Sequence, residues 1–200
     1  MLVVGIIVVA VLAALSISLI GSDRDTQPRD AASDSTVVAP TQPNTAATTP
    51  TTVDPEQALR NDVEAGYSAA AQAFFEAAAI PDPNYPGLAA THTGPMLDVR
   101  RGLMIALVGD GRIMRLPPNS QYRNDFESIE FPPEHNRTVA ILTVCGVDDR
   151  EVVDAATGNV ITAGPGTVES RAAMRLEDGV WKLAEREELG RWPGVAGCAA

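Results

Sequence analysis

Lysine is nearly missing from this sequence: Lys182 is the only one, and the other basic residues are arginines. The 15 basic residues are outnumbered by 26 acidic ones, which gives a net charge of −11 at pH 7. The basic residues also form no cluster along the chain. A protein that binds nucleic acid needs a concentrated positive surface to displace counterions from the phosphates. The composition therefore argues against a nucleic-acid partner.

Cysteine and histidine are almost as scarce, with two of each in 200 residues. The four residues do not fall at the spacing of a structural zinc site. The sequence has no glycine-rich phosphate loop, and its acidic pairs lack the loop spacing that calcium ligands need. We therefore expect no metal and no nucleotide cofactor.

Residues 1–22 carry no charged side chain, and Leu2 to Ile20 forms one apolar run. As a helix this run would be about 28 Å long, close to the thickness of the hydrocarbon core of a bilayer. No basic residue precedes the run, and it is longer than the apolar region of a typical signal peptide. We predict a retained single-pass membrane anchor; the alternative is a cleaved signal peptide.

Residues 23–53 are rich in proline and threonine and contain no aromatic residue, leucine or isoleucine. Such a segment cannot bury enough apolar surface to offset the entropy of ordering, so it predicts a disordered linker. Arg24 and Arg29 weakly favour a cytoplasmic location for the chain beyond the anchor. The two cysteines and the composition of the linker favour a location outside the cytoplasm. We therefore place residues 54–200 outside the cytoplasm.

The domain predicted at 54–200 begins with helices. Asp54 is a suitable N-cap and Pro55 suits the first helical position, and apolar residues then recur every three or four positions as far as Ile80. A second amphipathic helix is predicted from Thr93 to Gly109, with a short helical turn near Leu88 between them.

Strands are predicted from Arg112 onward, where the apolar period changes to two. Phe126 and Ile129 are out of phase in one strand, which indicates a β-bulge. Residues 138–147 are apolar on both faces, as in a central strand covered on each side. Asp178-Gly179 predicts a hairpin turn before the last strand. Helices followed by antiparallel strands predict the α+β class, with one curled sheet packed on the helices.

This order of elements, closing on the hairpin Asp178-Gly179-Val180-Trp181, resembles the nuclear-transport-factor-2-like superfamily, also called SnoaL-like or ketosteroid-isomerase-like. Residues 88–95 and 192–199 also resemble a set of uncharacterised actinobacterial membrane-anchored proteins. The resemblance covers residues 54–200 and implies a cone-shaped sheet with a pocket at its open end. It implies no single activity, because this fold hosts enzymes, carriers and interaction domains alike.

Cys145 lies in the predicted central strand and Cys198 lies near the end of the chain. Two cysteines without CxxC spacing in a domain outside the cytoplasm predict a disulfide. The alternative is two unrelated buried thiols.

The candidate pocket residues are Tyr67 and Glu185. Glu185 and Glu187 have the same parity as the apolar Trp181 and Leu183, so in a regular strand a carboxylate would point into the cone. In the enzymes of the resembling superfamily a pocket acid shuttles protons, and Tyr67 would supply an opposing hydroxyl. If the strand instead leaves the sheet after Leu183, both acids lie in water.

The other polar candidates are expected to be structural or solvated. They are His92, His135 and the acidic pairs Asp148-Asp149 and Glu187-Glu188. We identify no set of catalytic residues.

The sequence leaves three functions open. The first is an interaction or scaffold domain without enzymatic activity, which the sequence favours. The second is a binder of a small apolar ligand in the cone, and the third is a pocket enzyme of the isomerase, dehydratase or cyclase type. They differ in what fills the cone: side chains, an open apolar cavity, or an open cavity with a buried acid. A homodimer is a further expectation from the resembling fold.

Overall fold

The computed structural model describes residues 54–162 and 164–198. The predicted anchor at 2–20 and linker at 23–53 lie outside the described residues. Within the described part, no helix is long and apolar enough to cross a membrane.

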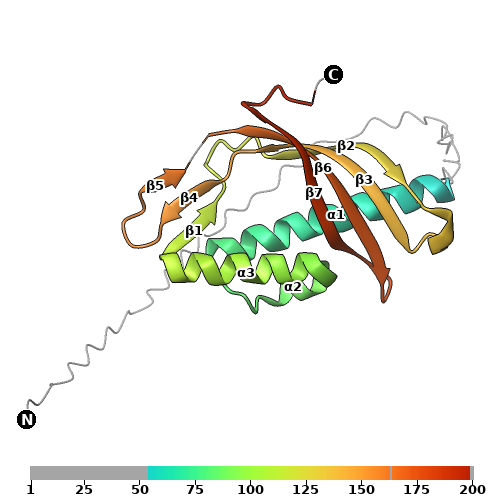
Figure 1. The fold of residues 1–200 in the computed structure, drawn as a ribbon, viewed down its shortest axis with the longest axis horizontal. Coiled ribbons are helices and arrows are strands. Elements are labelled where there is room, and N and C mark those ends of the chain that lie inside the picture. The colour runs from blue at the N-terminus through green and yellow to red at the C-terminus, as the bar shows by residue number, and fades with distance from the viewer. Residues whose placement is uncertain (1–53, 163, 199–200) are drawn as a thin grey trace, which may run out of the picture. The chain divides into compact units, whose positions relative to one another are not determined.

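Among residues 54–198, three helices precede the strands, as Figure 1 shows: α1 (Pro55–Ala79), α2 (Pro86–Thr91) and α3 (Gly94–Asp110). The predicted start of α1 is confirmed, because the Asp54 carboxylate accepts a hydrogen bond from the Glu56 amide at 3.0 Å. α3 ends where Gly111 takes a left-handed conformation with φ 64°, which glycine adopts without steric cost.

In the described part of the chain, seven strands form two antiparallel sheets, where the sequence predicted one. The small sheet has the order β1-β4-β5, and the large sheet has the order β2-β3-β6-β7. The strands are β1 (Arg112–Arg115), β2 (Arg123–Glu130), β3 (Val139–Asp148), β4 (Glu151–Asp154), β5 (Val160–Thr162), β6 (Gly166–Glu177) and β7 (Val180–Pro193). The chain leaves the large sheet after Asp148, and β4 then pairs with β1, which separates the two sheets. The α+β class is confirmed.

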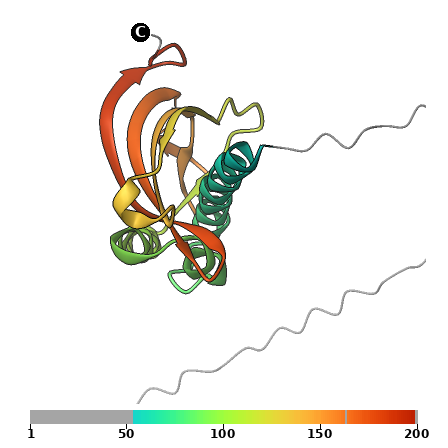
Figure 2. The same cartoon turned by 90° about the vertical axis from the view of Figure 1, so that its right-hand side faces the viewer.

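The large sheet curls over the helices, as the turned view in Figure 2 shows. β3 is one of its inner strands, and side chains alternate along it: Ala140, Leu142 and Val144 are buried, while Ile141 and Thr143 on the other face are only half-buried. The prediction of a central strand is confirmed, and its second face is only partly covered. The bulge predicted in β2 is present, where the pairing with β3 shifts between Phe126 and Ser128.

The core under the large sheet consists of apolar side chains that join α1 to all four strands. We call it the apolar cluster; its buried members include Val63, Tyr67, Leu142, Val144, Met174, Trp181 and Leu183. α1 and β7 approach closely at Gly66, where a Cβ atom would lie 2.6 Å from the Trp181 Cβ. A side chain at this position would force α1 and β7 apart, so the crossing favours glycine. A second cluster, around Phe74, Leu88 and Met104, packs the helices together.

The hairpin at Asp178-Gly179 is present, with both residues at positive φ (53° and 79°) as a type I′ turn requires. The segment after α2 docks on the strand that leaves this turn, because the Thr93 amide donates to the Leu183 carbonyl at 3.0 Å. β7 therefore contacts both the helices and β6. Its residues reach the interior from several sides.

Candidate functional site

A small cavity lies between α1, α3 and the large sheet. Its volume is about 40 Å³, which is room for a few water molecules. Pockets that hold whole organic ligands are about 300–1,000 Å³. Aromatic and arginine side chains fill the rest of the space; the lining includes Tyr67, Phe74, Phe75, Tyr122, Arg100, Arg150 and Arg186.

Three arginines face this cavity from three parts of the chain. Arg100 comes from α3, Arg150 from the turn between β3 and β4, and Arg186 from β7. We call these three residues the arginine cluster. One carboxylate, that of Asp148, also lines the cavity. The positive charge at this end of the interior contrasts with the net negative charge of the whole protein.

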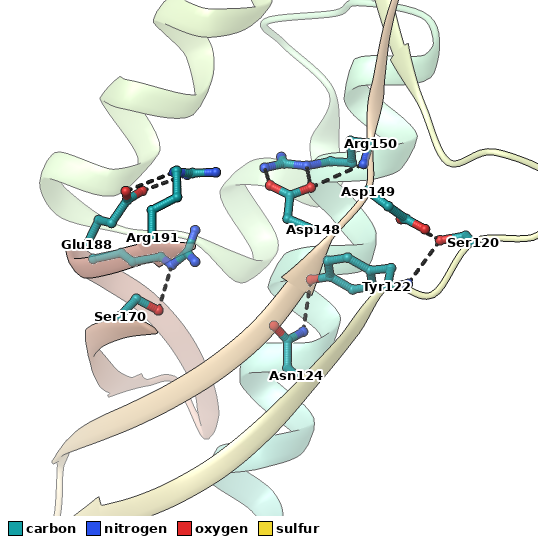
Figure 3. Close-up of polar contacts among 10 residues, drawn as sticks. Ser120, Tyr122, Asn124, Asp148, Asp149, Arg150, Ser170, Glu188 and Arg191 are labelled. Atoms are coloured by element: carbon teal, nitrogen blue, oxygen red, sulfur yellow. Dashed lines mark hydrogen bonds and ion pairs between the residues drawn. The ribbon is translucent and has the colours of Figure 1, made fainter. Parts of the chain in front are cut away.

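Asp148 and Arg150 form the only ion pair among the residues described as lining the cavity, as seen in Figure 3. The Arg150 Nε donates to Asp148 Oδ1 at 2.6 Å, and a second guanidinium nitrogen donates to Oδ2. Burial alone would raise the pKa of Asp148, but the hydrogen bonds and charge of Arg150 outweigh it and hold the pKa below its usual value. Asp148 is therefore an ionised acceptor at neutral pH.

Arg100 lies against an aromatic ring. Its guanidinium carbon is 4.0 Å from the centroid of Phe74, and that of Arg150 is 5.1 Å from the same ring. These are cation–π distances. Phe75 in turn meets Tyr122 edge-on, with ring centroids 4.6 Å apart. Stacking on aromatic rings thus positions two members of the arginine cluster, Arg100 and Arg150.

Burial and the neighbouring cations Arg150 and Arg186 lower the pKa of Arg100 to about 10. The Nε atom of Arg100 is buried and has no hydrogen-bond partner in the described part of the chain. No described carboxylate pairs with its guanidinium either. Arg100 remains charged at neutral pH, and among the arginines that line the cavity it is the one with a buried Nε atom that lacks a described hydrogen-bond partner.

Polar groups on the sheet complete the lining. Arg186 donates from Nε to the Ser170 hydroxyl at 3.1 Å, and Asn124 donates to the Tyr122 hydroxyl at 2.8 Å. Burial, as the main cause, raises the pKa of Tyr122, so its hydroxyl keeps its proton. The O–H of Tyr122 has no acceptor among the described residues, so it is free to donate into the cavity.

Of the two predicted pocket residues, Tyr67 lines the cavity and Glu185 does not. The cause is a bulge in β7. Ala173 pairs with Glu185 but Met174 pairs with Leu183, so Ala184 is an extra residue in the strand. One extra residue reverses the alternation of faces. Glu185 therefore lies outside, 58% exposed and paired with Arg175, and Arg186 points inward in its place.

The pair Asp148-Asp149 was expected to be solvated, and this expectation is wrong. Adjacent residues point to opposite faces as predicted, but both have partners within the domain. Asp148 pairs with Arg150, while Asp149 accepts from the Ser120 hydroxyl (2.7 Å) and the Gln121 amide (2.5 Å), as Figure 3 shows for Ser120. Asp149 thus fixes the loop before β2. Glu188 behaves as expected, half-exposed and paired with Arg191.

The two histidines occupy opposite environments. His92 is 1% exposed, with its Nδ1 atom 3.0 Å from the Thr91 hydroxyl. Burial and, after it, the charge of Arg100 lower the pKa of His92 to about 4, so the ring is neutral at pH 7. His135 has a half-exposed side chain. Within the described residues no group of three or more histidine, cysteine or acidic side chains could hold a metal ion.

The predicted disulfide joins Cys145 of β3 to Cys198, with Cα atoms 6.0 Å apart. Hydrogen bonds seat the tail next to it: the Thr167 hydroxyl donates to the Gly194 carbonyl at 2.9 Å and accepts from the Gly197 amide at 3.1 Å. Trp192 contacts the same tail, because a Cβ atom on Gly197 would lie 2.9 Å from the Trp192 Cβ. The tail therefore braces the end of the sheet from which Asp148 and Arg150 extend.

The arginine cluster was not predicted from the sequence. One signal was present: Arg100 falls on the apolar stripe of its helix, with Met96 and Leu103. A charged residue on an apolar stripe indicates a polar group inside the domain. The positions of Arg150 and Arg186 depend on a turn and a bulge, for which the local sequence has no such signal.

Comparison with solved structures finds a similar fold. The intermembrane space region of the chloroplast protein ARC6 matches with a TM-score of 0.55 and 16% sequence identity. The match covers 70% of this chain and 98% of that one. No protein-family model matches the sequence, and no curated protein is similar to it. At this identity the likeness concerns the fold alone.

Proposed function

We propose that residues 54–200 form a nuclear-transport-factor-2-like domain that acts as an interaction module outside the cytoplasm, held to a membrane by residues 2–20 through the linker at 23–53. The observation that carries the proposal is the filled interior. A cavity of about 40 Å³ leaves no room for the body of a substrate or an apolar ligand. The proposed interaction therefore takes place at the surface of the domain.

The arrangement of acids favours an interaction module over a pocket enzyme. A general base at neutral pH needs a carboxyl with a raised pKa. Glu185 lies outside the cavity, and the pKa of Asp148 is lowered by Arg150. Neither group has the environment that proton transfer in an isomerase or dehydratase requires.

The disulfide supports a location outside the cytoplasm, because such bonds persist in oxidising compartments. Protease added to intact cells stripped of their wall should remove the domain while a cytoplasmic control protein survives. Survival of the domain alongside that control would contradict the placement, and domain found free in the medium would contradict the anchor.

The interaction itself can be tested by photo-cross-linking in cells, on the full chain. A cross-linking residue would be placed at Val99 or Ile105 on α3 and at Val160 or Ile161 on β5, all of which are exposed. A partner-binding surface should give one discrete adduct from one of the two elements and none from the other. The adduct mass separates a second copy of this chain from a different protein. Absence of an adduct at all four positions would contradict an interaction through either surface.

A further inference from the structure

We propose that the arginine cluster binds the oxyanion head group of a small amphiphilic ligand, whose apolar body lies in a groove outside the cavity. The ligand class is a carboxylate or phosphate group on an apolar body. This site goes beyond the proposed function, because a ligand bound from this groove leaves the exposed face of α3 available to a partner.

The charge inside the domain favours an anion. Arg100, Arg150 and Arg186 bring three cations to one small cavity, and among the described residues Asp148 is the one carboxylate that lines it. A buried charge without a partner is costly. Arg100 has no described ion-pair partner, and its Nε atom is buried without a hydrogen bond. An anion placed beside Arg100 would offset that cost.

Asp148 and Arg150 connect the cavity to a space outside it. These two residues line the inner cavity and also line a groove on the outside, with a volume of about 590 Å³. The ion pair is therefore the wall between the two spaces. If Arg150 turns away from Asp148 toward an incoming anion, it exchanges the Asp148 carboxylate for the head group of the ligand. The inner cavity then opens into the groove. Asp148 acts as an internal competitor for the site.

The outer groove has the size and lining that an apolar body requires. Its volume falls within the usual range for small-molecule sites, whereas the inner cavity has room for only a small head group. The groove contributes apolar surface from Met114, Val152, Pro165, Trp192 and Pro193. Such a surface suits an apolar body that ends in a charged group.

The cavity also offers the donors that an oxyanion needs. Guanidinium groups bind carboxylate and phosphate through paired N–H donors. The Tyr122 hydroxyl accepts from Asn124 and so directs its own hydrogen elsewhere. Because its pKa is raised, chiefly by burial, it stays a donor across the neutral range.

The test uses the full chain in nanodiscs of phosphatidylcholine and titration calorimetry. Three probes separate charge from apolar surface: hexanoate has both, hexanol lacks the charge, and inorganic phosphate lacks the apolar body. We expect hexanoate to bind with a Kd of about 1 mM or tighter, phosphate to bind more weakly, and hexanol not to bind. No detectable hexanoate binding, or equal affinity for hexanol, would overturn the proposal.

Two variants should move the affinity in opposite directions. Arg100→Met keeps most of the length of the side chain and removes its charge, and should weaken hexanoate binding by at least about tenfold. Asp148→Asn removes the internal competitor and should strengthen binding several-fold. A gain of affinity cannot arise from misfolding, so this variant decides the question even if Arg100→Met does not fold. Weaker binding by Asp148→Asn would overturn the proposal.

Arg115→Met is the matched control, since Arg115 is exposed, pairs with Glu151 and does not line the cavity or the groove. Its affinity for hexanoate should equal that of the unmodified chain. Nanodiscs that contain phosphatidylglycerol then distinguish two sources of the head group. Reduced hexanoate affinity in these discs indicates competition by a lipid head group, and unchanged affinity indicates a free amphiphile.

Discussion

The apolar cluster and the arginine cluster lie under the same curled sheet but are held together by different forces. In the apolar cluster, Leu142, Met174 and Trp181 pack by burial, which is non-directional and tolerates small shifts. In the arginine cluster, each cation depends on a particular partner: Phe74 for Arg100, Asp148 for Arg150 and Ser170 for Arg186. One end of the interior therefore supplies stability, and the other holds charge in a defined arrangement.

The largest effect is expected from the disulfide, which braces the end of the large sheet next to the arginine cluster. Replacing both Cys145 and Cys198 by alanine should lower the free energy of unfolding by about 4 kcal/mol, the chain-entropy value for a sequence separation of 53 residues. Denaturant unfolding of the full chain measures this loss. Amide exchange should rise more at residues 145–148 than at 140–144.

Either single substitution should cost nearly as much as the pair, because one cysteine already breaks the bond. Unmodified protein under reducing conditions is the control and should match the double variant. Equal stability of reduced and oxidised protein would show that the tail hydrogen bonds, and not the disulfide, brace this end.

Leu142→Ala tests the packing of the apolar cluster. Leu142 is fully buried, so the substitution should cost about 3 kcal/mol through lost burial and the cavity that remains. Ile141→Ala is the matched control, because the neighbouring residue faces the half-buried side of β3 and should cost about 1 kcal/mol. Equal losses from the two variants in denaturant unfolding would contradict the assignment of faces.

The next effect is a sensitivity to acid at His92, which pairs with Leu183 of the apolar cluster and feels the charge of Arg100 of the arginine cluster. The pKa of His92 is about 4 in the folded protein, against an ordinary value of 6.5. As the pH falls, the unfolded chain therefore protonates His92 at a higher pH than the folded protein does. The contribution of neutral His92 to the free energy of unfolding is fully present above pH 6.5, and it is lost as the pH drops toward 4. The loss between pH 7 and pH 5 should be about 2 kcal/mol.

His92→Gln should remove most of this slope, while His135→Gln, at a half-exposed position, should leave it unchanged. Thermal unfolding at several pH values measures both. An equal slope in the His92→Gln variant would assign the acid sensitivity to other groups.

The smallest effect separates two helical glycines. At Gly66 an alanine Cβ would meet Trp181 at 2.6 Å, so the helix must shift and Gly66→Ala should cost about 1 kcal/mol net. At Gly102 on α3 nothing lies within 4 Å, and Gly102→Ala should stabilise by up to about 1 kcal/mol. Melting temperatures that change in the same direction would contradict the close approach of α1 and β7.

The apolar cluster could be predicted from the sequence, and the arginine cluster could not. The helix from Asp54, the bulge near Phe126 and the Asp178-Gly179 turn depend on neighbours along the chain, so local patterns indicate them. The place of Glu185 depends on one extra residue, Ala184, in the pairing of β6 with β7. That bulge reverses the faces and replaces a predicted acid by Arg186.

The disulfide was predictable from chemistry, because two cysteines without CxxC spacing, in a domain that the sequence predicts to lie outside the cytoplasm, have few other uses. The division into two sheets was not, since it depends on β4 pairing with β1 across a separation that no local pattern encodes. Long-range pairing and register are where this sequence is least informative.

The link between Cys145 and Cys198 also sets how the domain responds to mechanical force. Every strand after β3 lies inside the closed loop, so pulling on the two ends of the chain cannot extend β4, β5, β6 or β7 while the bond is intact. The sequence separation of 53 removes about 180 Å from the length that unfolding can release. An oxidised domain under tension would therefore lengthen through its helices and first strands only, and reduction would release the remaining length.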